Sequence, residues 1–294
     1  MKELILGILQ VLGPLSVAAI VFSQGLGISP LRVLAYFQER PGMVLRALFG
    51  ALVLVPMAAL VLILLLKPSQ ALAVGLAILV ACPPAPLMLK AATKKGGGNA
   101  EFMASLHLSL ALLAFVSVPA ILFLLSLPLG FRAEVDQAAM ALILAKTIVL
   151  PVGLGLAVRY FSPGFADKFG PVIGKVGTIG LMVVVLFAVV AFYPALLNMD
   201  AWSYLVIVLV SAAALAIGHF FASGDDSERT VLAVECGVRH PVLALTIASA
   251  NFGQAQALPI LVPCVVTFIA MAMAYLIWRG KHARPEGSPI PGNR

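Results

Sequence analysis

Residues 231–251 read VLAVECGVRHPVLALTIASAN, and this stretch sets the strongest constraint on the fold. Its two halves are apolar enough to lie in a membrane, yet Glu235, Arg239 and His240 stand in the middle. A charged side chain at the centre of a membrane helix costs about 2.5–3.5 kcal/mol on insertion scales. Pro241 follows directly, lacks a backbone donor and should break the helix. Ionisable residues at this depth predict a functional site inside the membrane.

The composition is that of an integral membrane protein. Of the 294 residues, 62% are hydrophobic and 11% are charged, and the mean hydropathy is +1.10. A soluble domain carries about 25% charged residues. The net charge of +7 does not indicate a nucleic-acid partner, because Lys and Arg flank the apolar segments instead of forming one face. Cys82, Cys236 and Cys264 lie in apolar segments and predict no disulfide framework.

Apolar runs of about 20 residues predict nine transmembrane helices. The runs cover residues 4–24, 44–66, 71–92, 102–127, 135–160, 171–197, 202–222, 229–251 and 257–278. The connections are short, so residues 1–280 are expected to form a single transmembrane domain. The first run is too long for a signal peptide and is expected to stay as an uncleaved span. Residues 281–294 are basic and rich in Pro and Gly, which predicts a disordered cytoplasmic tail.

The distribution of Lys and Arg predicts the orientation in the membrane. With nine spans, fourteen of the 19 Lys and Arg residues fall on one side, three on the other, and Lys146 and Arg239 inside spans. Cationic loops stay in the cytoplasm. The C-terminus is therefore expected in the cytoplasm and the N-terminus outside, in a multi-pass protein of a bacterial plasma membrane.

A second span is also interrupted. The segment LAILVACPPAPLMLKAAT, residues 76–93, carries Pro83, Pro84 and Pro86 within four residues. Paired interruptions in two hydrophobic segments are typical of transporters built from inverted repeats. Non-helical backbone at membrane depth survives only where it is buried in protein or lines an aqueous cavity. The alternative is that the prolines merely kink two packed helices.

Several short motifs together resemble the bile acid:sodium symporter family over nearly the whole chain. They are the run Cys82–Leu89 with the Gly98-Asn99 corner, the run Glu235–Ala244, GLGIS at 25–29, Arg40-Pro41 and Pro56. The resemblance implies an all-α fold with a panel domain and an inverted-repeat core, in which two discontinuous helices, about 71–92 and 229–251, cross. It also implies that the chain starts at the family's second helix, which agrees with nine spans.

At the sodium-binding positions the chain departs from the family pattern. In the family, sodium is held by hydroxyl, amide and carboxylate oxygens. The resemblance places these ligands at Met88, Leu89, Met103, His107, Ala51, Arg239 and Glu235 of this chain. Only Glu235 keeps an oxygen ligand, and sodium, like other hard cations, requires oxygen. We therefore expect both sodium sites to be lost and no metal or other cofactor to be bound.

The residues around Pro241 suggest what takes the place of sodium. Glu235 and Arg239 are four positions apart and would share a face on a continuing helical turn, which predicts a buried ion pair. Pro241 leaves the carbonyl of Gly237 without its helical donor, and Arg239 has five donors to offer. Arg239 is thus expected to act as a tethered cation, either purely structural or also in contact with an anionic substrate.

The other candidate site residues are titratable or lie at the breaks. His107 and His240 are candidates for proton coupling, because a His side chain changes charge near neutral pH, although each could simply be a hydrogen-bonded structural residue. Lys146 lies deep in its span and is expected either to face a cavity or to pair with an acid. Cys82, Pro83, Met88 and Leu89 complete the predicted site at the helix crossing.

We therefore expect a secondary transporter of a small organic anion that is independent of sodium. Two alternatives stay open: a sodium-coupled symporter with relocated ligands, and a membrane sensor or binding protein that does not transport. No metal-ligand spacing, phosphate loop or nucleophile with its base indicates an enzyme. The expected partners are the anionic substrate and the lipid bilayer, and the sequence does not define the oligomeric state.

The predicted topology places Lys67 and Lys94 on opposite sides of the membrane. Single cysteines introduced as Lys67→Cys and Lys94→Cys should react with an impermeant thiol reagent from outside and from the cytoplasmic side, respectively. The unmodified protein is the control, because its three cysteines lie in apolar segments. Labelling of both positions from the same side would contradict the nine-span topology.

Overall fold

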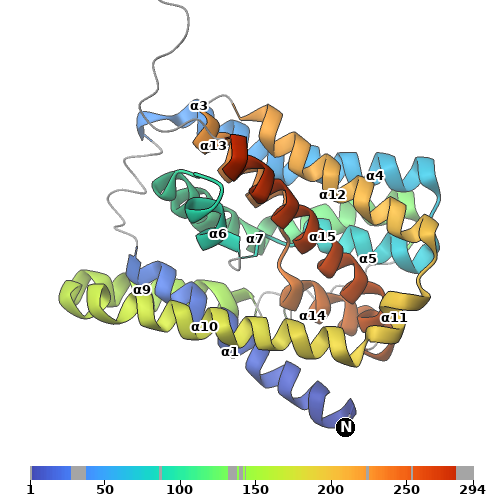
Figure 1. Ribbon diagram of the computed structural model, residues 1–294, viewed down its shortest axis with the longest axis horizontal. Coiled ribbons are helices and arrows are strands. Elements are labelled where there is room, and N and C mark those ends of the chain that lie inside the picture. Colours follow the sequence, from blue (N-terminus) through green and yellow to red (C-terminus); the bar gives the residue numbers. More distant parts are fainter. Residues whose placement is uncertain are drawn as a thin grey trace, which may run out of the picture.

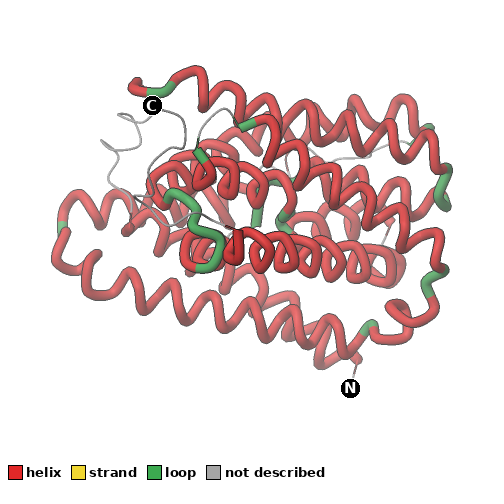
Figure 2. The backbone as a smooth tube through the Cα atoms, turned by 45° about the horizontal axis from the view of Figure 1, so that its top comes forward, coloured by secondary structure: helices red, strands yellow, loops and turns green. Residues whose placement is uncertain are grey.

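The computed structural model describes residues 2–27, 38–85, 88–131, 138, 142, 144–222, 225–252 and 254–282. Within these ranges the chain is helical and forms no strand, which Figure 2 shows as helices joined by short loops. This confirms the all-helical class predicted from the sequence. The greater part of the predicted tail, residues 283–294, lies outside the described residues, as do Pro86 and parts of the predicted span 135–160.

The described helices lie within or overlap the predicted apolar runs, but the nine-span count stays a prediction. They are α1 (Lys2–Gly27), α3 (Pro41–Phe49), the π-helix η1 (Gly50–Leu54), α4 (Val55–Leu66), α5 (Gln70–Ala81), α6 (Leu89–Lys94), α7 (Ala100–Leu129), the π-helix η3 (Ala145–Val149), α9 (Leu150–Phe161), α10 (Pro163–Ala191), α11 (Tyr193–Asn198), α12 (Ala201–Phe221), α13 (Asp226–Gly237), α14 (Pro241–Phe252) and α15 (Gln254–His282). In the described part of the chain, five segments are long and apolar enough to cross a membrane: Pro41–Leu66, Phe102–Leu129, Pro163–Ala191, Ala201–Phe221 and Pro259–His282.

Helices α1, α9 and α10 form a layer of their own along one side of the molecule (Figure 1). Two glycines allow α1 and α9 to approach closely. A Cβ atom at Gly25 would lie 2.6 Å from the carbonyl oxygen of Val152 and 3.0 Å from the Cα of Gly155. A Cβ at Gly155 would in turn collide with the carbonyl oxygen of Phe22. Small residues at helix contacts are the usual means of packing helices in membranes, where the hydrophobic effect offers little.

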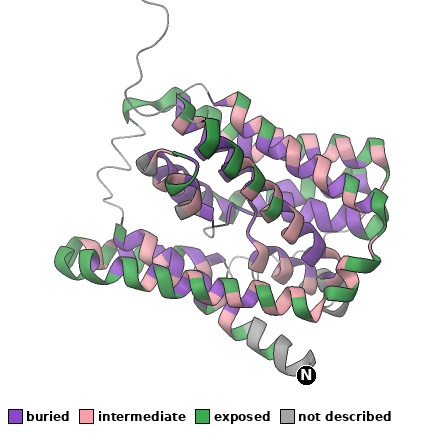
Figure 3. Ribbon diagram, in the orientation of Figure 1, coloured by how far each residue is buried: buried purple, intermediate pink, exposed green. Residues whose placement is uncertain are grey.

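Helices α4, α7, α14 and α15 pack against α5, which is the most buried element. Every residue from Leu72 to Ala81 is buried, and Figure 3 colours this helix as buried. Its side chains form one apolar cluster with residues of α7, α12, α14 and α15. Large apolar side chains are instead exposed along the outer helix faces, as expected for surfaces in contact with lipid. A helix buried on all sides can hold irregular backbone at its end without exposing it to hydrocarbon.

Polar contacts fix the start of α13 at one end of the molecule. Asp225 caps this helix by accepting hydrogen bonds from the Glu228 amide at 2.9 Å and the Ser227 hydroxyl at 2.6 Å. Partial burial alone would raise the pKa of Asp225, but these hydrogen bonds outweigh it and hold that pKa below its ordinary value. Arg40, which precedes α3, forms an ion pair with Glu228. The start of α3 is thereby tied to the start of α13.

The close contact of α1 with α9 predicts different effects for two glycines on one helix. Gly155→Ala should destabilise the protein by about 1–3 kcal/mol, because the added methyl group overpacks the contact with α1. Gly153→Ala is the matched control, since nothing lies within 4 Å of a Cβ there. It should be neutral or stabilising by up to about 1 kcal/mol, because Ala favours a helix over Gly. Thermal unfolding in detergent checks both, and equal effects would contradict the packing.

Candidate functional site

Two helices end inside the apolar core. Helix α5 ends at Ala81, and the next residue, Cys82, is extended with φ −67° and ψ 149°. Helix α13 ends at Gly237, and Val238 is extended with φ −118° and ψ 121°. Both interruptions lie where the prolines predicted them, and the chain resumes a helix at α6 and at α14. The ends of α5 and α13 thus lie in the interior, each followed by an extended segment.

The two extended segments pair with each other in an antiparallel manner. The Ala85 amide donates to the Val238 carbonyl at 3.2 Å, and the His240 amide donates to the Pro83 carbonyl at 2.9 Å. This pattern places Pro84 in a position that needs no amide donor, since the flanking residues make the hydrogen bonds. Prolines are therefore tolerated on this segment, and they prevent the helix from continuing through it.

Arg239 lies opposite Pro84 in this pairing and is only 4% exposed. One terminal nitrogen of its guanidinium donates to the Cys82 carbonyl at 3.2 Å, and the other donates to the Ala51 carbonyl at 3.4 Å. Its Nε has no partner. Ala51 lies in η1, where the wider π-turn changes the helical hydrogen-bond ladder. A single side chain therefore links the ends of both interrupted helices to a third element.

The ion pair predicted between Glu235 and Arg239 is not formed, although both residues are described. The prediction assumed a continuing helical turn, but α13 ends at Gly237 and Arg239 is extended. The side chains therefore leave the backbone in different directions. Arg239 donates to backbone carbonyls, as predicted, but these belong to Cys82 and Ala51 and not to Gly237.

Glu235 contacts His107 of α7 instead. The Nδ1 atom of His107 lies 3.2 Å from both carboxylate oxygens, and both side chains are buried. With a proton on Nδ1, the imidazole donates a hydrogen bond to the carboxylate. A buried carboxylate needs such a partner, because an unpaired charge in the interior is very costly. The sequence singled out both residues but did not predict their contact.

His240 has a structural role at the start of α14. Its Nδ1 atom accepts a hydrogen bond from the Leu243 amide at 3.1 Å, which caps the first turn. Pro241 occupies the first position of the helix, where a missing amide costs nothing. The other ring nitrogen of His240, Nε2, is buried without a partner.

The methionines predicted at the site lie in an apolar environment. Met88 and Met103 are buried and belong to one cluster with Ala51 and Phe102. Leu89 begins α6, and its side chain lies outside the described residues. Among the described residues, no group of three or more His, Cys, Asp or Glu side chains is arranged to hold a metal ion.

Lys146 lies away from the crossing, on the π-helix η3. Leu144 and Ile148 on the same segment are buried, whereas Lys146 is exposed on the opposite face. No acid among the described residues pairs with it. Helix η3 packs against both α1 and α7, so it borders the two layers of the fold. The sequence left two alternatives for Lys146, facing a cavity or pairing with an acid, and the second is not observed among the described residues.

An apolar cavity of about 70 Å³ lies between α10, α14 and α15. Aliphatic side chains line it, and Pro241 and Val242 form the wall next to the helix break. The cavity therefore lies between the start of α14, next to the helix break, and the layer that contains α10.

Comparison with known proteins adds to this geometry. The model of the sodium bile acid symporter family matches residues 14–198, which is more than half of the chain and includes the first interrupted helix. A probable sodium/metabolite cotransporter, BASS2 of the chloroplast of Oryza sativa subsp. japonica, is 24% identical over 235 residues. This alignment covers 77% of the chain and 54% of the rice protein, so the chain spans about half the length of this relative.

Removing the imidazole should leave Glu235 buried without its partner. His107→Leu is expected to destabilise the protein by about 3–5 kcal/mol, the usual cost of breaking a buried pair. The double variant His107→Leu/Glu235→Gln should recover a large part of that loss, because the charge is removed with its partner. Denaturation of the four proteins of this cycle measures the coupling. Additive effects of the two substitutions would show that the contact contributes nothing.

Proposed function

Since the chain belongs to the sodium bile acid symporter family, we propose that it is a secondary transporter of a small organic anion that works without sodium. The observation that carries the proposal is the buried guanidinium of Arg239, which is bound to backbone carbonyls where the interrupted helices meet. A cation that is part of the chain neither enters nor leaves with the substrate. It can hold the crossing together but cannot couple transport to an ion gradient.

The arrangement of the helices supports this proposal. Two interrupted helices that meet in the interior are typical of transporters whose site lies at the interface of two inverted repeats. We assign α1, α9 and α10 to the panel domain and the remaining helices to the core. The nine-span topology, with the N-terminus outside and the C-terminus in the cytoplasm of a bacterial cell, is part of the same proposal.

The chemistry of the crossing does not fit a sodium ion. Sodium needs several oxygen ligands, by the same reasoning that applies to other hard cations. The carbonyls of Cys82 and Ala51 already accept hydrogen bonds from Arg239, so a positive charge occupies the place next to them. Met88 and Met103, which stand where the family's ligands are expected, offer only thioether groups in an apolar cluster. Glu235 alone supplies carboxylate oxygens, and His107 contacts both.

The substrate is proposed to be an anion with an apolar body. Lys146 is an exposed cation in the middle of a predicted span, and a charge at that depth must face water or a ligand and not lipid. Arg239 is less suited to this role, because it is buried and engaged by carbonyls. The side chains that line the cavity beside Pro241 are aliphatic, so the surroundings of the second helix break are apolar on this side. The rice relative is named a sodium/metabolite cotransporter, which agrees with a small-molecule substrate.

Lys146→Gln should weaken anion uptake. We expect the KM for a transported organic anion to rise about tenfold, which corresponds to about 1.4 kcal/mol of lost attraction. Lys146→Arg keeps the charge and should retain most of the affinity. Uptake into proteoliposomes measures both variants. An unchanged KM in Lys146→Gln would remove this residue from the substrate site.

Uptake of organic anions should be the same when sodium outside the proteoliposomes is replaced by potassium or choline. This comparison tests the proposal directly, because a sodium symporter loses concentrative uptake without its gradient. The matched variant is Arg239→Gln, which removes the built-in cation while keeping a polar side chain. A requirement for sodium in the unmodified protein would favour a symporter with relocated ligands. Binding without transport in every salt would favour a membrane sensor.

A further inference from the structure

A groove of about 400 Å³ lies between α12 and α15, outside the site described above. Small side chains form its floor: Ala212 and Ala216 on α12, and Ala274 on α15. At one end the groove is bordered by His219, Tyr275 and Trp278. The larger apolar side chains of Leu215, Phe220 and Met271 complete the lining.

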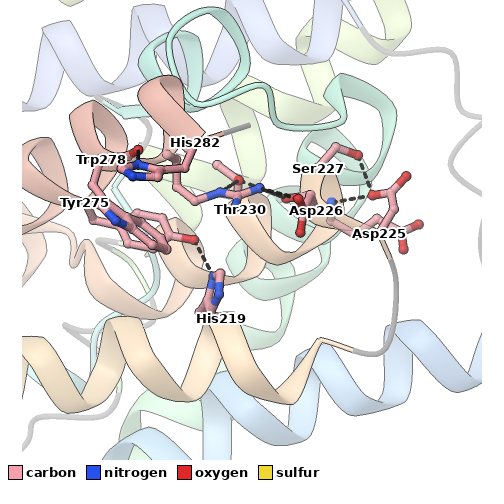
Figure 4. Close-up of polar contacts among 10 residues, drawn as sticks. His219, Asp225, Asp226, Ser227, Thr230, Tyr275, Trp278 and His282 are labelled. Atoms are coloured by element: carbon pink, nitrogen blue, oxygen red, sulfur yellow. Dashed lines mark hydrogen bonds and ion pairs between the residues drawn. The ribbon is translucent and has the colours of Figure 1, made fainter. Parts of the chain in front are cut away.

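The polar end of the groove is a set of rings held together by defined contacts (Figure 4). The His219 Nδ1 atom lies 2.9 Å from the Tyr275 hydroxyl. The ring of Trp278 lies 5.8 Å from the ring of His219 and 5.4 Å from that of His282. Trp278 is 46% exposed, and Phe220 next to His219 is 79% exposed. Tyr and Trp with one apolar and one polar end are typical of the level where lipid tails meet headgroups.

Positive charge gathers at the same end. Arg279 follows Trp278, with its guanidinium carbon 5.9 Å from the Trp278 ring, and donates to the Thr230 hydroxyl at 2.9 Å. Lys281 and His282 are exposed in the last turn of α15. Arg279 is itself only 4% exposed, and the Asp226 carboxylate lies 3.7 Å from its guanidinium. Lys281 thus supplies an exposed cation at this end of the groove. The distribution of Lys and Arg along the chain predicts that this end of α15 is on the cytoplasmic side.

We propose that this groove binds an anionic phospholipid of the cytoplasmic leaflet. One acyl chain lies on the alanine floor, and the phosphate lies at the ring cluster beside the basic last turn of α15. The apolar floor opens onto the outer helix faces, where lipid tails are the surrounding medium. Anionic lipids concentrate in the cytoplasmic leaflet, and basic pockets between transmembrane helices at that level bind their headgroups. This proposal rests on the proposed orientation of the chain in the membrane, but not on transport activity or on sodium independence.

The chain contains two tryptophans, and they provide a built-in comparison. Trp278 borders the groove, whereas Trp202 lies at the first turn of α12, at the other end of that helix. The full-length variant Trp202→Phe keeps Trp278 as its single tryptophan, and Trp278→Phe keeps Trp202 as its single tryptophan. Tryptophan fluorescence therefore reports one position in each variant. Each is reconstituted in phosphatidylcholine vesicles that contain a variable fraction of phosphatidylglycerol brominated on its acyl chains. Bromine quenches a tryptophan that it contacts.

Trp278 should be half-quenched at about fivefold lower mole fraction of brominated phosphatidylglycerol than of brominated phosphatidylcholine, the enrichment that one basic side chain near the surface provides. Trp202 should show no such preference. Equal quenching of Trp278 by the two lipids would overturn the proposal, because the groove would then distinguish no headgroup. The same preference at both tryptophans would overturn it as well, since it would reflect general attraction to the protein.

A substitution that fills the groove tests whether the anionic lipid binds there. Ala274 is exposed and lines the floor, so Ala274→Phe should fit without disturbing the core, and it should abolish the preference at Trp278. Ile277→Phe is the matched control, because Ile277 is 51% exposed on the same helix and does not line the groove. This variant should keep the preference. A preference that survives Ala274→Phe would contradict binding in the groove.

Discussion

A helix that is interrupted inside a membrane leaves carbonyl groups without donors, and no water is present to satisfy them. In this protein the two interrupted segments form hydrogen bonds with each other. Each provides amides for the carbonyls of the other, and Arg239 provides donors for the carbonyls of Cys82 and Ala51. The burial of α5 follows from this requirement. The broken ends must be buried, so α5 is enclosed by neighbouring helices and carries apolar side chains on all sides.

The same requirement explains why a buried guanidinium is tolerated here. An isolated charge in the interior would be very costly, but the guanidinium of Arg239 donates to two backbone carbonyls, whose oxygens carry partial negative charge. It also accounts for the roles of neighbouring residues. His240 caps α14 with one ring nitrogen, and His107 gives Glu235 a partner. Both histidines thus stabilise groups that the interruption of α13 places in the interior.

The sequence predicted the features that depend on a single local signal. The three prolines after Cys82 and the single Pro241 lie beside the two observed breaks, because a missing amide donor acts on its own helix. The Glu235–Arg239 ion pair was wrong, because the four-residue spacing has meaning only if the helix continues beyond Gly237. The contact of His107 with Glu235 joins positions 128 residues apart, and no local pattern carries it. The groove was also missed, since alanines on α12 and α15 are ordinary residues of a membrane helix until the two helices are placed side by side.

Whether Arg239 takes the place of bound sodium is decided most directly by the thermal stability of the purified, unmodified protein in increasing sodium chloride, with potassium chloride as the ionic-strength control. A ligand that binds only the folded state stabilises it by RT ln(1 + [L]/Kd). At a sodium concentration about ten times the Kd, a sodium site would therefore add about 1.4 kcal/mol to the free energy of unfolding. With the guanidinium of Arg239 in place, the unfolding temperatures in the two salts should coincide at every concentration. A saturable rise with millimolar sodium that potassium does not produce would show that a sodium site persists, and would contradict the role assigned to Arg239.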